Sequence, residues 1–245
     1  MALFDKLFDY CERGSDPAFW AEPVNALTNV GFLLAGGYAI CRALAIEPRR
    51  PERALGLALG ALVMVIGTGS FLFHTFATGL AKLADVIPIM VFMLAYLGVA
   101  LRVLLGLRWL AVGALLIAFF AALMLAERIP CRGLLSIVDA ARGRCLNGTI
   151  GYLPAWLALL AVGATLRLRG HAAARPMLLA AAVFAVSMLF RSLDRALCPT
   201  WSYGTHSLWH LLNATTLFLL LKAVVDIPAG RRDREASTHD RRVRP

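Results

Sequence analysis

Long stretches of apolar residues alternate with short polar segments along this chain. Seven stretches reach about twenty residues, the length at which an α-helix crosses a bilayer. They cover residues 23–46, 54–76, 82–105, 107–126, 150–166, 176–197 and 203–225. The pattern therefore predicts an all-α fold, a bundle of seven transmembrane helices.

Composition supports this interpretation. Hydrophobic residues make up 60% of the 245 residues and charged residues 16%, whereas a soluble domain is nearer half apolar and a quarter charged. A chain of this length forms one bundle, which we expect to comprise residues 1–226. Residues 1–22 carry several charges and lack the apolar core of a signal peptide, so the first span is expected to act as its own insertion signal.

Basic residues indicate how the bundle is oriented. Seven spans place the two termini on opposite sides of the membrane. With the N-terminus outside, most of the 25 lysines and arginines fall in cytoplasmic segments, as the positive-inside rule requires. Arginines between residues 127 and 149 weaken this contrast. We therefore expect residues 1–22 to be extracytoplasmic, the C-terminus to be cytoplasmic, and the protein to lie in the inner membrane of a bacterium.

The net charge of +10 comes from these topology signals and from a basic segment at residues 227–245. It therefore gives no reason to expect nucleic-acid binding, and the sequence indicates no obligate protein partner. The basic segment lacks apolar anchors, so it is predicted to be a disordered cytoplasmic tail. It either rests on anionic lipid or is a solvated end without a role.

Polar side chains inside the apolar stretches are costly in a bilayer and therefore indicate function. In a helix, Ser70 and His74 lie four residues apart and share one face. A short turn near residues 78–79 would bring Asp85, at the start of the next span, back beside His74. Asp85 has a second interpretation, because an aspartate can also cap the start of a helix.

His206 and His210 form a similar pair near the other end of the chain, again four residues apart. In the predicted topology they lie in the same extracytoplasmic half of the membrane as His74. Three neutral imidazoles with an open fourth position are the ligand set of a catalytic zinc. One such pair arises often by chance, but a third histidine with Ser70 and Asp85 nearby favours a zinc site.

Oxygen donors gather in the segment before the first span, at Asp9, Glu12, Asp16 and Glu22. Calcium takes several such oxygen ligands, but the spacing does not match an EF-hand. The residues alone therefore favour a solvated acidic loop over a calcium site.

Four of the five cysteines fall on the predicted extracytoplasmic side, where disulfides are permitted. Cys131 with Cys145 would close the longest loop, and Cys11 with Cys198 would tie the N-terminal segment to the loop before the last span. Free thiols are the alternative, and Cys41 is expected to face the cytoplasm.

At these residues the chain resembles the alkaline ceramidase family of seven-helix membrane hydrolases, part of a superfamily with the progestin and adiponectin receptors. The resemblance extends from residue 9 to residue 210, with the motifs in matching order. The matching pieces are Asp9-Tyr10-Cys11-Glu12, Trp20-Ala21-Glu22 with Asn25, Gly67-Thr68-Gly69-Ser70-Phe71-Leu72-Phe73-His74-Thr75, Asp85 with Pro88-Ile89-Met90, Asp194 with Cys198, and His206-Ser207-Leu208-Trp209-His210.

The resemblance implies a zinc ion held by His74, His206 and His210. It implies that Asp85 orients or deprotonates the zinc-bound water, and that Ser70 helps to hold the oxyanion. It also implies a disulfide between Cys11 and Cys198.

The resemblance further implies calcium. The ligands would be Asp9, Glu12, Glu22 and the backbone carbonyls of Tyr10 and Gly14. The chain departs from the family here, because its N-terminal loop is one residue shorter than usual and Gly14 replaces a polar asparagine. Lys82 and Val86 likewise stand where Gln and Glu are common.

Together these features predict a zinc-dependent intramembrane hydrolase that cleaves the amide bond of a lipid. The resemblance implies ceramide as the substrate, entering from the bilayer, and another amide or ester lipid is the alternative within this class. Two other classes remain open: a receptor or sensor with structural zinc, and a zinc-free channel or transporter in which the histidines and Asp85 relay protons.

Overall fold

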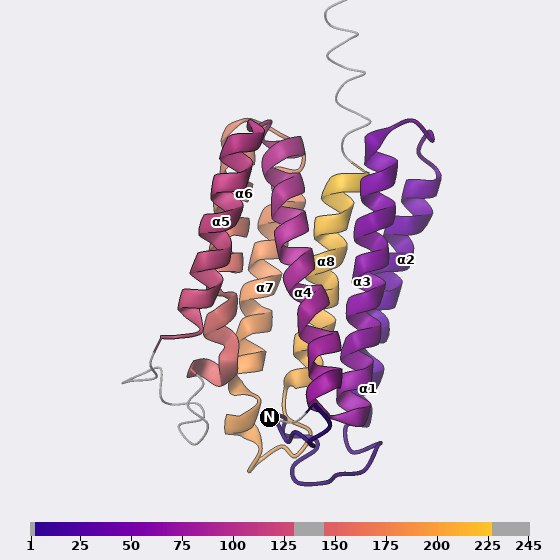
Figure 1. Ribbon diagram of the computed structural model, residues 1–245, viewed down its shortest axis with the longest axis vertical. Coiled ribbons are helices and arrows are strands. Elements are labelled where there is room, and N and C mark those ends of the chain that lie inside the picture. The colour runs from indigo at the N-terminus through magenta and orange to yellow at the C-terminus, as the bar shows by residue number, and fades with distance from the viewer. Residues whose placement is uncertain (1–2, 130–144, 227–245) are drawn as a thin grey trace, which may run out of the picture.

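The computed structural model describes residues 3–129 and 145–226, which fold into an elongated bundle of roughly parallel and antiparallel helices (Figure 1). Within these ranges, seven helical stretches are long and apolar enough to cross a membrane. They are Pro23–Leu44, Pro51–Phe76, Gly79–Leu104, Trp109–Ala126, Cys145–Leu168, Ala174–Leu193 and His206–Val225. The predicted all-α, seven-span fold is confirmed.

The first span consists of two helices, α1 (Pro23–Thr28) and α2 (Val30–Leu44). Next come α3 (Pro51–Phe76) and α4 (Gly79–Val99), and α4 continues as the π-helical turn η1 (Ala100–Leu104). The second half comprises α5 (Trp109–Ala126), the 3₁₀ segment η4 (Cys145–Tyr152), α6 (Leu153–Leu168), α7 (Ala174–Leu193), the 3₁₀ turn η5 (Arg195–Leu197) and α8 (His206–Val225).

The last helix, α8, is the most buried of the seven spans. It packs against α7 on one side and against α2 and α3 on the other (Figure 1). Side chains at the start of α8 can therefore meet residues from several helices. Further along, Leu220, Leu221 and Val224 pack into the main hydrophobic core.

Two predicted spans differ from the helices in the structure because polar side chains interrupt them. The first span breaks at Asn29, whose side-chain amide donates to the carbonyls of Asn25 and Ala26. Such local bonds compete with the helix. The span predicted for 176–197 ends as an α-helix at Leu193, because Asp194 turns its carboxylate toward backbone amides at the start of α8.

The predicted turn between α3 and α4 is present. Ala77 ends α3 in the left-handed region, with φ of 49°, and the Thr78 hydroxyl caps α4 by accepting from the amide of Ala81 at 3.3 Å. Gly69 lies where α3 meets α4, and a β-carbon there would clash with the carbonyl of Ala84. A glycine at position 69 therefore lets α4 approach α3 closely at Ala84, the residue before Asp85.

The N-terminal segment covers the end of the bundle where α3 ends and α8 begins (Figure 1). The amide of Leu7 donates to the carbonyl of Ala77 at 2.7 Å. Cys11 and Cys198 form a disulfide, with Cα atoms 5.5 Å apart, so this predicted pairing is confirmed. Cys131 lies outside the described residues, and its pairing with Cys145 stays a prediction.

Candidate metal centre

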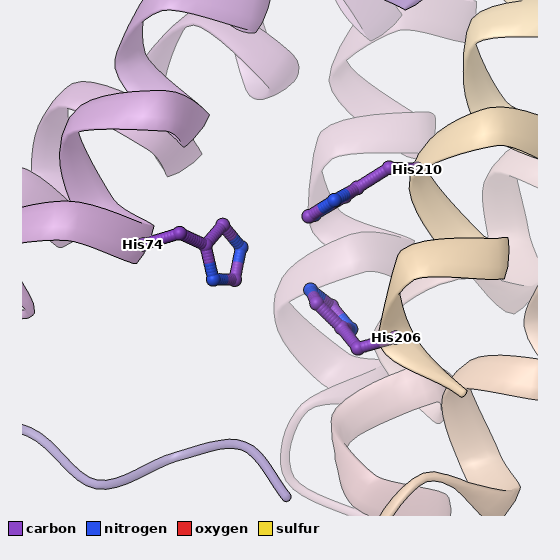
Figure 2. Close-up of side chains that lie close together, drawn as sticks. All are labelled: His74, His206 and His210. Atoms are coloured by element: carbon purple, nitrogen blue, oxygen red, sulfur yellow. The ribbon is translucent and has the colours of Figure 1, made fainter. Parts of the chain in front are cut away.

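Three buried histidines meet at this covered end of the bundle. His74 lies in the last turn of α3, and His206 and His210 lie in the first two turns of α8. Figure 2 shows the three rings turned toward one another from these two helices. One ring nitrogen from each lies within 4.8 Å of the others, and all three residues are buried. The structure thus brings together the residues that the sequence singled out as zinc ligands.

Hydrogen bonds fix which nitrogen of His74 is available to a metal. Its Nδ1 lies 2.6 Å from the Glu22 carboxylate, which can only accept, so Nδ1 carries the proton. The other nitrogen, Nε2, therefore has an unshared electron pair. Nε2 is buried and has no hydrogen-bond partner in the described structure. A ligating histidine whose second nitrogen is held by a carboxylate is a recurring feature of zinc sites.

His210 is held in the same way by a hydroxyl group. Its Nδ1 lies 3.0 Å from the Thr28 hydroxyl oxygen. The Thr28 hydroxyl has a single hydrogen, and the backbone carbonyls of Val24 at 2.9 Å and Asn25 at 3.0 Å both lie within its reach. With that hydrogen on a carbonyl, the hydroxyl oxygen accepts from Nδ1–H of His210, which leaves Nε2 of this ring available as a ligand.

His206 completes the cluster from the first residue of α8. Its ring stacks on the buried ring of Tyr10, with centroids 3.8 Å apart. Its Nδ1 is buried and has no partner in the described structure. A buried nitrogen without a partner is costly unless another group occupies the space that it faces. The donor set is three neutral imidazoles, two of which are oriented by a hydrogen bond at Nδ1. This set fits a zinc ion.

Asp194 positions the start of α8. Its carboxylate accepts from the amides of Thr205 at 2.7 Å, His206 at 2.9 Å and Cys11 at 3.2 Å. Burial raises the pKa of this carboxyl, and the three amides offset that effect only in part. Together with the disulfide, Asp194 ties the N-terminal segment to the residue that presents the first histidine of α8.

Ser70 and Asp85 lie on neighbouring helices beside this cluster. Ser70 is one turn before His74 on α3, and Asp85 is near the start of α4. Both residues are buried, and the hydroxyl interacts with the carboxyl. They line the same cavity as His206 and His210, so the structure brings the two predicted catalytic residues and two of the three histidines into one space.

A cavity of about 830 Å³ extends from this cluster into the bundle. Its walls are mostly apolar and include Tyr96, Met177, Thr216 and Leu220. His206 and Leu220 both line it, and their separation of fourteen positions on α8 corresponds to about 21 Å of helix. A cavity of this length and character suits a hydrocarbon chain.

Four of the five groups predicted to bind calcium have other partners in the structure, those of Asp9, Tyr10, Glu12 and Glu22. Both oxygens of Glu12 accept from the backbone amides at the start of α1, at 2.7 and 2.8 Å. Asp9 forms an ion pair with Lys82 at 2.6 Å, and the carbonyl of Tyr10 accepts from the amide of Gly14 at 3.3 Å.

Glu22, the fifth predicted calcium ligand, is shared between the histidine cluster and an arginine. Its second oxygen accepts from Nε of Arg13 at 2.5 Å. Burial alone would raise the pKa of Glu22, but hydrogen bonds from His74 and Arg13 outweigh it and lower that pKa. Among the described residues, Asp9, Glu12 and Glu22 do not gather at metal-binding spacing.

Two arginines near the site were missed by the sequence analysis. Arg13 is buried beneath α3, and Arg191 lines the cavity from α7. The guanidinium carbon of Arg191 lies 4.9 Å from the centroid of Trp209 and 5.6 Å from that of Tyr152. The signal for Arg191 was present, since a charged residue inside an apolar span indicates function by default.

Comparison with known proteins places nearly the whole chain in one family. Residues 7–241 match the family model described as Ceramidase. The match covers nearly the whole chain and includes all three histidines, Ser70 and Asp85. A search of curated proteins finds none that matches the chain.

Proposed function

We propose that this chain, which belongs to the ceramidase family, is a zinc-dependent hydrolase that cleaves the amide bond of a lipid inside the membrane. Membership of the family supports ceramide hydrolysis in general. The observation that supports the zinc-dependent form is the cluster of three buried histidines beside an apolar cavity, two of which have a ring nitrogen without a partner in the described structure.

His74, His206 and His210 would hold the metal. Bound there, zinc would supply Lewis-acid polarisation of the amide carbonyl and of water. Glu22 and Thr28 fix the orientation of two of the rings, which keeps the ligand nitrogens directed toward one point and reduces reorganisation on binding.

Asp85 and Ser70 would carry the proton transfers and part of the charge stabilisation. Asp85 accepts a proton from the attacking water, whose oxygen forms the new bond to the amide carbon. Ser70 donates a hydrogen bond to the oxyanion that develops on the former carbonyl oxygen. As the carbon–nitrogen bond breaks, Asp85 returns the proton to the leaving amine. The products are a fatty acid and a long-chain amine, which is sphingosine if the substrate is ceramide.

The cavity would hold the acyl chain of the substrate. Its apolar walls favour a lipid that enters from the bilayer, because the hydrocarbon then moves between two apolar environments at little cost. The distribution of basic residues along the sequence supports an extracytoplasmic position for this end of the bundle.

Hydrolysis of defined lipids by purified protein tests this function. Wild type, His210→Ala and Asp85→Asn would be assayed for fatty-acid release from ceramides and other N-acyl lipids, with zinc content measured in parallel. We expect about one zinc per wild-type chain, and loss of hydrolysis in both variants. Equal activity in the three proteins would refute the mechanism. Stoichiometric zinc without hydrolysis of any lipid would instead favour a receptor or sensor.

A further inference from the structure

Arg13 is a charged residue that the fold buries completely at the covered end of the bundle. Its side chain has 0% exposure. A guanidinium has five N–H donors and accepts nothing, so it can be buried at low cost only where several oxygens converge on it. The structure provides such a place between the N-terminal segment and the end of α3.

Five oxygen contacts surround the guanidinium. The Nε–H donates to the Glu22 carboxylate. Nη1 donates to the backbone carbonyls of Asp16 at 3.1 Å and Ala18 at 2.8 Å. Nη2 donates to those of His74 at 2.8 Å and Thr75 at 3.4 Å. The Arg13 cage is defined by these acceptors: the Glu22 carboxylate and the backbone carbonyls of Asp16, Ala18, His74 and Thr75. The number of contacts equals the number of N–H groups.

The cage has the chemistry of a site for a hard cation. One carboxylate and several backbone carbonyls are the ligands that calcium prefers. Two of the carbonyls belong to His74 and Thr75 in the last turn of α3, where carbonyls lack helical partners and the helix dipole favours positive charge. In this chain a guanidinium lies where such a cation would otherwise be needed.

We propose that Arg13 is a built-in cation that replaces calcium at this end of the bundle. The N-terminal loop and Glu22 are then fixed without a bound ion. The fate of the other predicted calcium ligands supports this, because Glu12 caps α1 and Asp9 pairs with Lys82. The family resemblance implied a bound calcium ion at this end of the bundle, and the Arg13 cage indicates a protein that needs none.

The cage also connects Arg13 to the candidate zinc site. Glu22 binds Arg13 through one oxygen and Nδ1 of His74 through the other. Arg13 additionally donates to the backbone carbonyl of His74 at 2.8 Å. Arg13 therefore acts as a positioning residue for this ligand, and this part of the inference rests on the proposed function.

Calcium measurements on the wild-type protein test the inference first. The purified full chain would be compared in calcium and in EGTA, with free zinc held constant by a zinc buffer because EGTA also binds zinc. We expect no bound calcium by elemental analysis, and no change in Tm or in zinc content between the two conditions. Stoichiometric calcium, or a Tm that rises with added calcium, would overturn the proposal.

Variants of Arg13 give the second test. In Arg13→Ala the oxygens of the cage lose their cation, so we expect a lower Tm, zinc affinity weakened about 10–100-fold, and a Tm that now rises with added calcium. Arg13→Lys retains the charge with fewer donors and should restore part of the zinc affinity.

Arg53→Ala is the matched control, because Arg53 also donates to two backbone carbonyls, those of Leu44 and Ile46, far from the cage. It should leave zinc affinity unchanged and confer no response to calcium. If Arg13→Ala, like wild type, shows no change in Tm with added calcium, the cage does not bind cations and the proposal is contradicted. If Arg13→Ala does not fold, Arg13→Lys and the wild-type measurements still decide.

These readouts need no substrate, so the two proposals fail separately. A protein that binds zinc, does not respond to calcium and hydrolyses no lipid would refute the proposed function and leave the proposal for Arg13 standing. A protein that hydrolyses lipid only with bound calcium would support the proposed function and overturn the proposal for Arg13.

Discussion

Glu22→Gln is the most informative single change in this protein, because the carboxylate serves two neighbours at once. Glutamine keeps the size and shape of the side chain but removes its charge. It leaves the Arg13 guanidinium, with a side-chain exposure of 0%, without a counter-charge in a buried place. It also takes away the anionic acceptor for Nδ1–H of His74.

The expected effects follow from these two contacts. Removing one partner of a buried ion pair costs about 3–5 kcal/mol, because the remaining charge stays desolvated. That is a large share of the roughly 5–15 kcal/mol that stabilises a typical protein. Loss of the carboxylate behind a ligating histidine should weaken zinc binding about 10–100-fold.

Two assays separate the effects. Unfolding of detergent-solubilised protein by denaturant measures the stability loss in zinc-free buffer, and competition with a chromophoric chelator measures zinc affinity. Arg42→Gln is the control, since it breaks an ion pair with Asp226 in which the arginine side chain is 54% exposed. Exposed pairs contribute little, so this variant should resemble wild type in both assays. A Glu22→Gln protein as stable as the control, with unchanged zinc affinity, would refute the reasoning.

The disulfide, the carboxyl of Asp85, the cavity and the carboxyl of Asp226 can each be tested by one substitution. Cys198→Ser should cost about 2–5 kcal/mol of stability, measured by denaturant unfolding, and reductant should affect wild type similarly. Asp85→Asn should bind zinc normally by elemental analysis yet release no fatty acid. Thr216→Phe narrows the cavity and should slow hydrolysis of long-chain substrates more than of short-chain ones, as a substrate series would show. Burial would raise the carboxyl pKa of Asp226, but Lys222, Tyr38 and Arg42 lower that pKa below its ordinary 3.8. The contribution of Asp226 to stability is therefore complete above pH 3.8 and is lost as the pH falls through the lowered pKa. Asp226→Asn should remove this acid sensitivity from Tm.

Much of this architecture could be predicted from the sequence because membrane helices follow simple rules. Apolar runs of sufficient length identify the spans, and a spacing of four residues places Ser70 with His74, and His206 with His210, on common faces. The breaks at Asn29 and Asp194 could not be placed, since hydropathy does not register where a polar side chain will bond to backbone.

The supporting contacts of the site were less accessible to sequence analysis. Arg13 lies among acidic residues in a polar segment, where an arginine is ordinarily solvated. Its burial depends on the carbonyls of His74 and Thr75, which lie 61 and 62 residues later in the chain. Thr28 supports His210 across 182 residues. Such contacts arise from tertiary packing and leave no local pattern.

We propose that His74, His206 and His210 bind one metal ion. X-ray absorption at the zinc edge of the purified wild-type protein tests it most directly. We expect about one zinc per chain, with three imidazole nitrogens and one oxygen at about 2.0–2.1 Å. A metal-free protein, or a zinc environment dominated by sulfur or by fewer than three imidazoles, would contradict it.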